Sequence, residues 1–104
     1  MKLIFAVMSL EDAVTASSEL SRQGYISTMM NGEGGFLRSP KTILMVGVEN
    51  MRLSEVLQCI EKSSHSREED VGSELDGGRY TLPERVRVGG AAVFVTDVEQ
   101  FYKL

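Results

Sequence analysis

The strongest constraint on the fold is the alternation of short apolar runs with stretches that repeat at the helical period. The runs are of strand length, and in the intervening stretches apolar side chains recur three and four residues apart, as on one face of a helix. The apolar runs are 2–8, 42–48 and 91–95, and the helix-period stretches are 9–23 and 50–62. With a further strand expected over 25–31, the order is β-α-β-β-α-β. This order predicts an α+β, ferredoxin-like fold in which two helices cover one face of an antiparallel sheet.

The ends of both helices carry recognisable signals. Ser9 is a favourable N-cap, and Asp12 stands three residues later in the capping-box position. Gly24 is typical of the residue that ends a helix, and Asn50 is expected to cap the second helix. The apolar stripe of the second helix consists of Leu53, Val56, Leu57 and Ile60.

Glycine and proline divide the rest of the chain. Three glycines within 31–35 and the break at Ser39-Pro40 predict a glycine-rich hairpin connection between the second and third strands. Residues 63–83 are polar and rich in turn formers, so we expect a long loop without regular structure that is poorly ordered without ligand. Gly89-Gly90 predicts a tight bend before the last apolar run.

Length and composition indicate a single domain, 1–104, that contains the long loop at 63–83. Apolar residues make up 42% of the 104 residues, and the formal net charge is -4. An acidic chain lacks the basic face of a nucleic-acid binder, and no apolar run approaches the roughly 18 residues of a membrane span. The one cysteine, Cys59, cannot form an internal disulfide. We therefore expect a cytoplasmic globular protein that binds neither nucleic acid nor membranes.

Two helices can cover only one face of a four-stranded sheet. The strands also supply apolar side chains to the other face, and these would remain in water in a single copy. They include Tyr25, Met29, Met30, Met45 and Phe94. Such a face is typically sealed against copies of the same chain, so the pattern itself predicts an oligomer.

The most specific local motif is Gly34-Gly35-Phe36-Leu37-Arg38. Its glycines could expose backbone N–H groups to an anion and Arg38 could pair with a phosphate, but the same glycines would also serve a hairpin turn alone. A similar loop binds phosphate in the acylphosphatases. There the loop follows the first strand, whereas here it joins the second and third, which argues against that activity.

The other reactive side chains form no catalytic or metal-binding constellation. Cys59 and His65 supply two ligands, and a zinc site needs three or four. The acidic run Glu68-Glu69-Asp70 is typical of a solvated loop, and the serines have no histidine at a recognisable spacing. We therefore predict no enzyme activity, no metal site and no cofactor.

Segments along the whole chain match one protein family in order. They are Met1-Lys2-Leu3-Ile4, Gly34-Gly35-Phe36-Leu37-Arg38, Val46-Gly47-Val48, the stretch from Val86 to Val95, and the tail Phe101-Tyr102. In this register the sequence resembles the PII-like cyclic di-AMP receptors, the PstA-type members of the nitrogen regulatory PII superfamily. The resemblance runs from Met1 to Leu104.

This resemblance implies a homotrimer that binds cyclic di-AMP in clefts between subunits, catalyses no reaction and signals to an unknown downstream protein. It implies that Thr28 hydrogen-bonds the ligand and that Gly35, Phe36 and Leu37 line the adenine pocket. Gly47 would leave room on the neighbouring strand. The full set of expected ligand-binding residues is Thr28, Gly35, Phe36, Leu37, Lys41, Gly47, Gly89 and Gly90, the last two bordering the cleft.

The chain differs from well-known binders of the family at four positions. Gly24 and Ile26 replace an asparagine and an arginine, Lys41 replaces another asparagine, and Lys103 replaces a glutamine. Each lost charge-assisted contact could cost ~1.5–3 kcal/mol, whereas the two lysines attract phosphate as point charges. The alternative function is therefore a PII-like module that binds another adenine nucleotide or only a protein partner.

Overall fold

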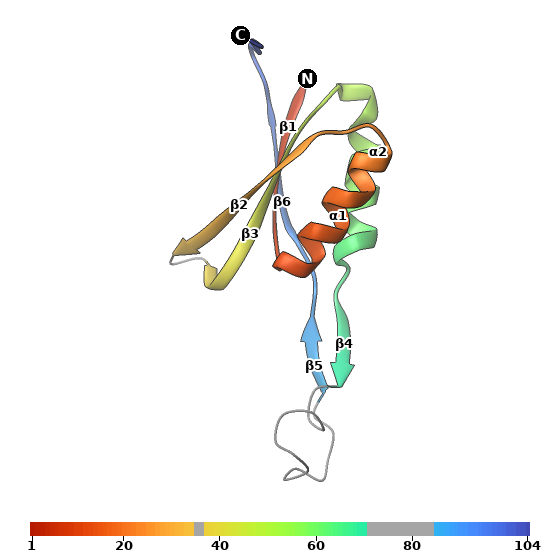
Figure 1. Cartoon of the computed structure of the whole chain (residues 1–104), viewed down its shortest axis with the longest axis vertical. Coiled ribbons are helices and arrows are strands. Elements are labelled where there is room, and N and C mark those ends of the chain that lie inside the picture. The colour runs from red at the N-terminus through yellow and green to blue at the C-terminus, as the bar shows by residue number, and fades with distance from the viewer. Residues whose placement is uncertain (35–36, 71–84) are drawn as a thin grey trace.

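A computed structural model describes residues 1–34, 37–70 and 85–104 of the chain (Figure 1). Two α-helices and six strands are present in this part, with one short 3-10 helix, Asn50–Arg52. The helices are α1 (Leu10–Arg22) and α2 (Leu53–Ser64). The strands are β1 (Lys2–Met8), β2 (Ser27–Gly34), β3 (Leu37–Val48), β4 (Arg67–Asp70), β5 (Arg85–Val88) and β6 (Ala92–Asp97).

Four strands form the main sheet in the order β2-β3-β1-β6, and every neighbouring pair is antiparallel. Both helices lie on one face of this sheet, and the two termini emerge at the same end of the molecule (Figure 1). The backbone N–H of Val98 donates to the carbonyl of Met1 at 3.0 Å, which ties the two ends together. The predicted α+β, ferredoxin-like architecture is confirmed.

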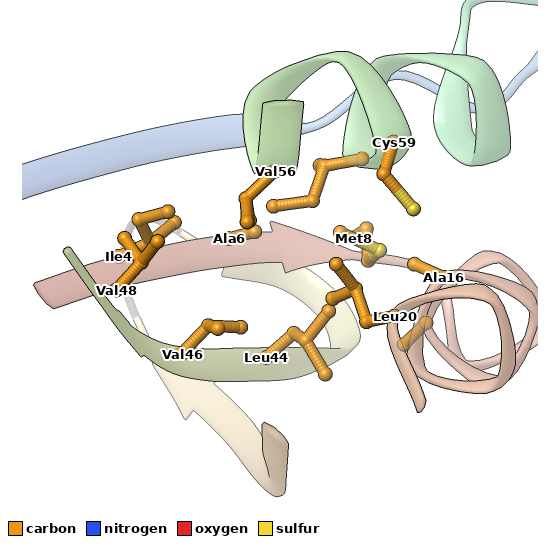
Figure 2. Packing of buried hydrophobic residues seen from close by; sticks show 12 residues of the cluster. Ile4, Ala6, Met8, Ala16, Leu20, Leu44, Val46, Val48, Val56 and Cys59 are labelled. Atoms are coloured by element: carbon orange, nitrogen blue, oxygen red, sulfur yellow. The ribbon is translucent and has the colours of Figure 1, made fainter. Parts of the chain in front are cut away.

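The hydrophobic core lies between the sheet and the helices (Figure 2). The central strands contribute alternate residues, because successive side chains on a strand point to opposite faces. The buried set is Ile4, Ala6 and Met8 from β1, Leu44, Val46 and Val48 from β3, Ala13, Ala16 and Leu20 from α1, and Val56, Cys59 and Ile60 from α2.

The first helix begins and ends as its sequence predicts. Ser9 is the N-cap, and its hydroxyl accepts the backbone N–H of Asp12 at 3.2 Å. At the other end Gly24 has a φ of 91°, the left-handed region that glycine enters without steric cost. The N–H of Gly24 bonds to the Ser21 carbonyl and that of Tyr25 to the Leu20 carbonyl, the two bonds of a Schellman motif.

The second helix begins later than its sequence predicts. Asn50 does not cap it: Asn50 opens the 3-10 turn, and Arg52 is the N-cap of α2 without a side-chain capping bond. The predicted apolar stripe is confirmed, because Val56 and Ile60 are buried while Leu53 and Leu57 pack against the core from its margin.

The β2–β3 hairpin is longer than predicted, because β3 begins at Leu37 rather than at Thr42. Proline lacks the N–H that a regular ladder requires, but it is tolerated at edges and bulges. The register shifts between Gly32, paired with Lys41, and Gly34, paired with Leu37, so Pro40 falls within the irregular part. Among the described residues, those of β3 before Thr42 also have no partner on β1, which makes this end of the strand an edge on that side.

The prediction of an unstructured loop over 63–83 is wrong for its first residues. Ser63 and Ser64 complete α2, and β4 pairs with β5 in a separate two-stranded ribbon beyond the end of α2 (Figure 1). Glu68 stands opposite Arg87, and opposite charges across an antiparallel pair are favourable. The rest of the expected loop, 71–83, lies outside the described residues.

Candidate ligand site

The face of the sheet opposite the helices holds one half of the candidate site. Thr28 on β2 pairs with Met45 on β3, and Gly47 lies two residues further along β3, so Thr28 and Gly47 share this open face. A Cβ atom at Gly47 would meet no atom of the described residues within 4 Å. Packing within one copy therefore does not require glycine at this position, and the space above it is available to a ligand or a second copy.

The structure separates the hairpin tip from Thr28. Leu37 pairs with Gly34, six residues along β2 from Thr28, which corresponds to ~20 Å at the usual strand rise. Lys41 shares the open face but pairs with Gly32, four residues from the position opposite Thr28. Thr28 is thus too far along the strand to join the tip across the hairpin of one copy.

Gly35 and Phe36 lie outside the described residues. Their expected role in an adenine pocket therefore stays a prediction. The same holds for Leu37, whose backbone ends the β2–β3 pairing.

Gly89 and Gly90 form the predicted bend between β5 and β6, with φ values of 84° and 87°. The N–H of Gly90 donates to the carbonyl of Ser64 at the end of α2. A side chain at Gly89 would collide with backbone, since its Cβ would lie 2.4 Å from the carbonyl oxygen of His65. Beside this bend runs a groove of about 280 Å³, lined by Leu57, Ile60 and Ser64 of α2 and by Gly90, Ala91 and Val93.

These two parts of the site lie at opposite edges of the sheet. The order β2-β3-β1-β6 places Thr28 on one edge strand and Gly90 just before the other. Three strand spacings, ~14 Å, separate those edges. One copy of the chain does not bring the predicted residues into a single pocket, whereas two copies placed edge to edge could.

The open face is apolar, but it is composed differently from the prediction. Met30, Met45 and Phe94 lie on it, and Phe94 is 55% exposed beside Phe5. Met29 instead pairs with Leu44 and therefore points to the helix side, at the uncovered edge of the core. The physical reason is alternation along β2, which cannot place Met29 and Met30 on the same face.

Tyr25 is also absent from the open face. Its ring packs against the core, its hydroxyl donates to Glu55 at 3.0 Å, and the guanidinium of Arg52 lies 5.7 Å from the ring centroid. Burial and the bond to Glu55 raise the pKa of the Tyr25 hydroxyl. This cluster ties the chain before β2 to the start of α2, while the neighbouring Ile26 remains 87% exposed.

The described residues hold no group of three or more histidine, cysteine, aspartate or glutamate side chains placed to bind a metal. Cys59 is buried. Burial raises the pKa of its thiol, and the negative charge of the nearby Glu19 carboxylate raises it further. A thiol of this kind is a poor nucleophile. His65 is exposed at the end of α2, and its Nδ1 lies 3.2 Å from the carbonyl of Lys62.

Neither helix among the described residues is long and apolar enough to cross a bilayer.

Sequence reasoning missed one partly buried ion pair next to the glycine bend. Nη2 of Arg67 donates to Oδ1 of Asp12 at 3.2 Å, and the two residues are 55 positions apart. Asp12 had a local signal three residues after the N-cap Ser9, but a partner that distant leaves no pattern in a single sequence. Residues 63–70 are polar and were expected to be solvated, so nothing in the sequence marked Arg67 as the partner of a buried carboxylate.

The fold defines the chain as an α+β, ferredoxin-like protein. The chain belongs to the cyclic-di-AMP receptor family, whose model matches residues 1–104. It is also similar to a solved structure described as a functionally unknown protein from Pediococcus pentosaceus ATCC 25745. The two share 38% identity with a TM-score of 0.82, over 99% of this chain and 96% of the other.

Proposed function

We propose that this protein is a signal receptor that assembles as a homotrimer and binds cyclic di-AMP in the clefts between its copies, without catalysing a reaction. The match of the cyclic-di-AMP receptor family to residues 1–104 carries the proposal. In the proposed cleft, Thr28 and the space above Gly47 come from one copy, and Gly89 and Gly90 come from its neighbour.

Two features of the single chain support a site between copies. The residues expected to bind ligand fall at opposite edges of the sheet. The open face also leaves large apolar side chains in water, including Met30 and Phe94, and burying such a face favours association. A larger hollow, about 460 Å³ between α1 and α2, is lined by Glu19, Glu55 and Cys59 on the far side of the helix layer and belongs to neither feature.

We also propose that the protein catalyses no reaction. The buried thiol of Cys59 lies within α2, the exposed ring of His65 follows its end, and no group of three or more histidine, cysteine, aspartate or glutamate side chains is placed to hold a metal. This statement covers the residues that the structure describes. Binding without turnover is the role that a receptor family implies.

A thermal-shift series tests the ligand. The wild type is heated with cyclic di-AMP, cyclic di-GMP, AMP, ADP or ATP, each in excess. A ligand at ~100 times its dissociation constant adds ~2.7 kcal/mol of stability, which corresponds to a rise in Tm of roughly 10–20 °C in a chain of this size. A shift specific to cyclic di-AMP supports the proposal, and its absence contradicts it.

The same series distinguishes the alternative. Ile26 and Gly24 precede Thr28 by two and four residues and carry no side-chain hydrogen-bonding group, which favours a weaker or different adenine ligand. A larger shift with AMP, ADP or ATP than with cyclic di-AMP would assign the site to that nucleotide. No shift with any of the five would favour a module that binds only a protein partner.

A further inference from the structure

Asp12 is a buried carboxylate in the first turn of α1. Its residue is 3% exposed, and its own N–H is satisfied by the hydroxyl of Ser9. Oδ1 accepts a hydrogen bond from Arg67, while Oδ2 has no hydrogen-bond partner among the residues that the structure describes. A buried carboxylate is strongly unfavourable without a cation, so the fold needs Arg67 at this place.

Arg67 is the first residue of β4, where the ribbon leaves the helix layer. Its second nitrogen, Nη1, donates to the carbonyl of His65 at 3.1 Å. A Cβ atom at Gly89 would lie 2.6 Å from that nitrogen. The guanidinium can therefore occupy this position only because residue 89 has no side chain.

A two-stranded antiparallel pair is at best marginally stable on its own, so contacts at the base of the ribbon matter for its position. These contacts include the Asp12–Arg67 pair, the Arg67–His65 bond and the bond from Gly90 to Ser64. All of them meet at the Gly89-Gly90 bend.

We infer that the Asp12–Arg67 ion pair positions the Gly89-Gly90 bend and the base of the β4–β5 ribbon against α1. Asp12 and Arg67 are positioning residues: they fix where Gly90 lies without contacting the ligand themselves. The second part of this inference, that the bend is thereby held in its ligand-binding position, rests on the proposed function.

Amide hydrogen exchange on the full-length protein tests the first part without any ligand. Asp12→Asn keeps the shape and removes the charge, and Arg67→Gln removes the cation. In both variants the Gly90 amide and the amides of β4 and β5 should exchange at least tenfold faster than in the wild type, while those of β1 and β3 keep their rates. Arg22→Gln is the matched control, because it breaks the exposed Arg22–Glu19 pair at the other end of α1 and should change neither group.

Three results would overturn the inference. They are an unprotected Gly90 amide in the wild type, unchanged exchange at the ribbon in both variants, and equal acceleration in the ribbon and the central strands. Arg67→Lys provides a milder change where a variant folds poorly, and should give an intermediate acceleration confined to the same amides.

The double variant Asp12→Asn/Arg67→Gln shows whether the two side chains act as a pair. It leaves no uncompensated buried charge, so its ribbon should exchange no faster than that of the worse single variant. If the two accelerations multiply instead, the side chains act independently and the pair is not the positioning element.

Titration with cyclic di-AMP tests the second part. The Asp12→Asn variant should bind cyclic di-AMP at least tenfold more weakly than the wild type. Its assembly should keep the wild-type mass. Wild-type affinity in a variant whose ribbon exchanges faster would show that the bend does not border the ligand. A wild type that fails to bind would refute the proposed function, whereas the exchange experiment would still decide the role of the ion pair.

Discussion

The two faces of the central sheet are built from the same strands but completed in different ways. On β1, Ile4, Ala6 and Met8 point to the helices and are buried, whereas Leu3, Phe5 and Val7 alternate with them and remain partly exposed. The helix side contains a core made entirely within one chain. The open side is also apolar, and no residue that the structure describes covers it.

Stability and function therefore depend on different faces of the sheet. Residues on the helix side stabilise the fold through the core, whereas residues on the open side are outside that core and available for assembly and binding. Thr28, Lys41 and Gly47 all fall on the open side, whereas Met29 falls on the other. The comparison predicts that substitutions on the two sides will have different consequences.

The largest expected effect belongs to the helix side. Ile4→Ala removes a fully buried side chain, and such truncations cost about 2–5 kcal/mol because they combine lost burial with a cavity. Urea denaturation measures the loss. The adjacent Leu3→Ala is its matched control, and in an unassembled sample it should lose much less. Equal losses there would contradict the difference between the two faces.

The next effect concerns assembly. Phe94→Asp places a charge on the open face, on the edge strand β6, where Phe94 lies opposite Phe5. Burying that carboxylate against another copy would be costly, so the variant should remain a monomer by light scattering at micromolar concentration. Val14→Asp, at an exposed position of α1, should keep the wild-type mass. A trimer of Phe94→Asp would place the interface elsewhere.

A smaller effect is expected at the ligand site. Gly47→Leu fills the open space above β3 and should weaken cyclic di-AMP at least tenfold, as calorimetry would measure. Gly47→Ala should be tolerated, because a Cβ atom has room there and glycine is a weak strand former. Unchanged affinity in the leucine variant would exclude Gly47 from the site, and loss of the trimer would assign it to the contact between copies.

The smallest effect lies at the end of the sheet where the termini meet. The hydrogen bond and charge of Lys2 lower the pKa of Asp97. In Lys2→Met the pKa of Asp97 should rise toward its ordinary value, as an NMR titration would show. Because the native pKa is lowered, the pair stabilises the protein at neutral pH and the contribution disappears as the pH falls through the lowered pKa. An unchanged titration in the variant would contradict the assignment to Lys2.

Local patterns predicted most of the fold. The bounds of β1 and the caps of α1 followed from residues next to one another, because apolar runs, N-caps and helix-ending glycines act over a few positions. The β4 strand was missed because it pairs with β5, nearly twenty positions further along the chain, which is beyond the reach of a local pattern. The late start of α2 was missed because the cap signal of Asn50 is not used: Glu49 is the N-cap of the 3-10 turn and Arg52 that of α2, and neither makes a side-chain capping bond.

The candidate site was predicted less completely than the fold. Alternation explains why Thr28 and Gly47 share a face, but the distance from Thr28 to Leu37 depends on how far the hairpin continues past Gly32. The Asp12–Arg67 pair depends on a contact between elements 55 residues apart. Both are properties of the packed structure, and a single sequence carries no signal for either.

Native mass spectrometry of the wild type with cyclic di-AMP tests the central claim most directly, because it reports assembly and ligand together. The account predicts a species of three times the 11.5 kDa chain mass that carries up to three molecules of cyclic di-AMP. A monomer that binds the ligand, or a trimer that gains no ligand mass, would contradict a binding site built between copies.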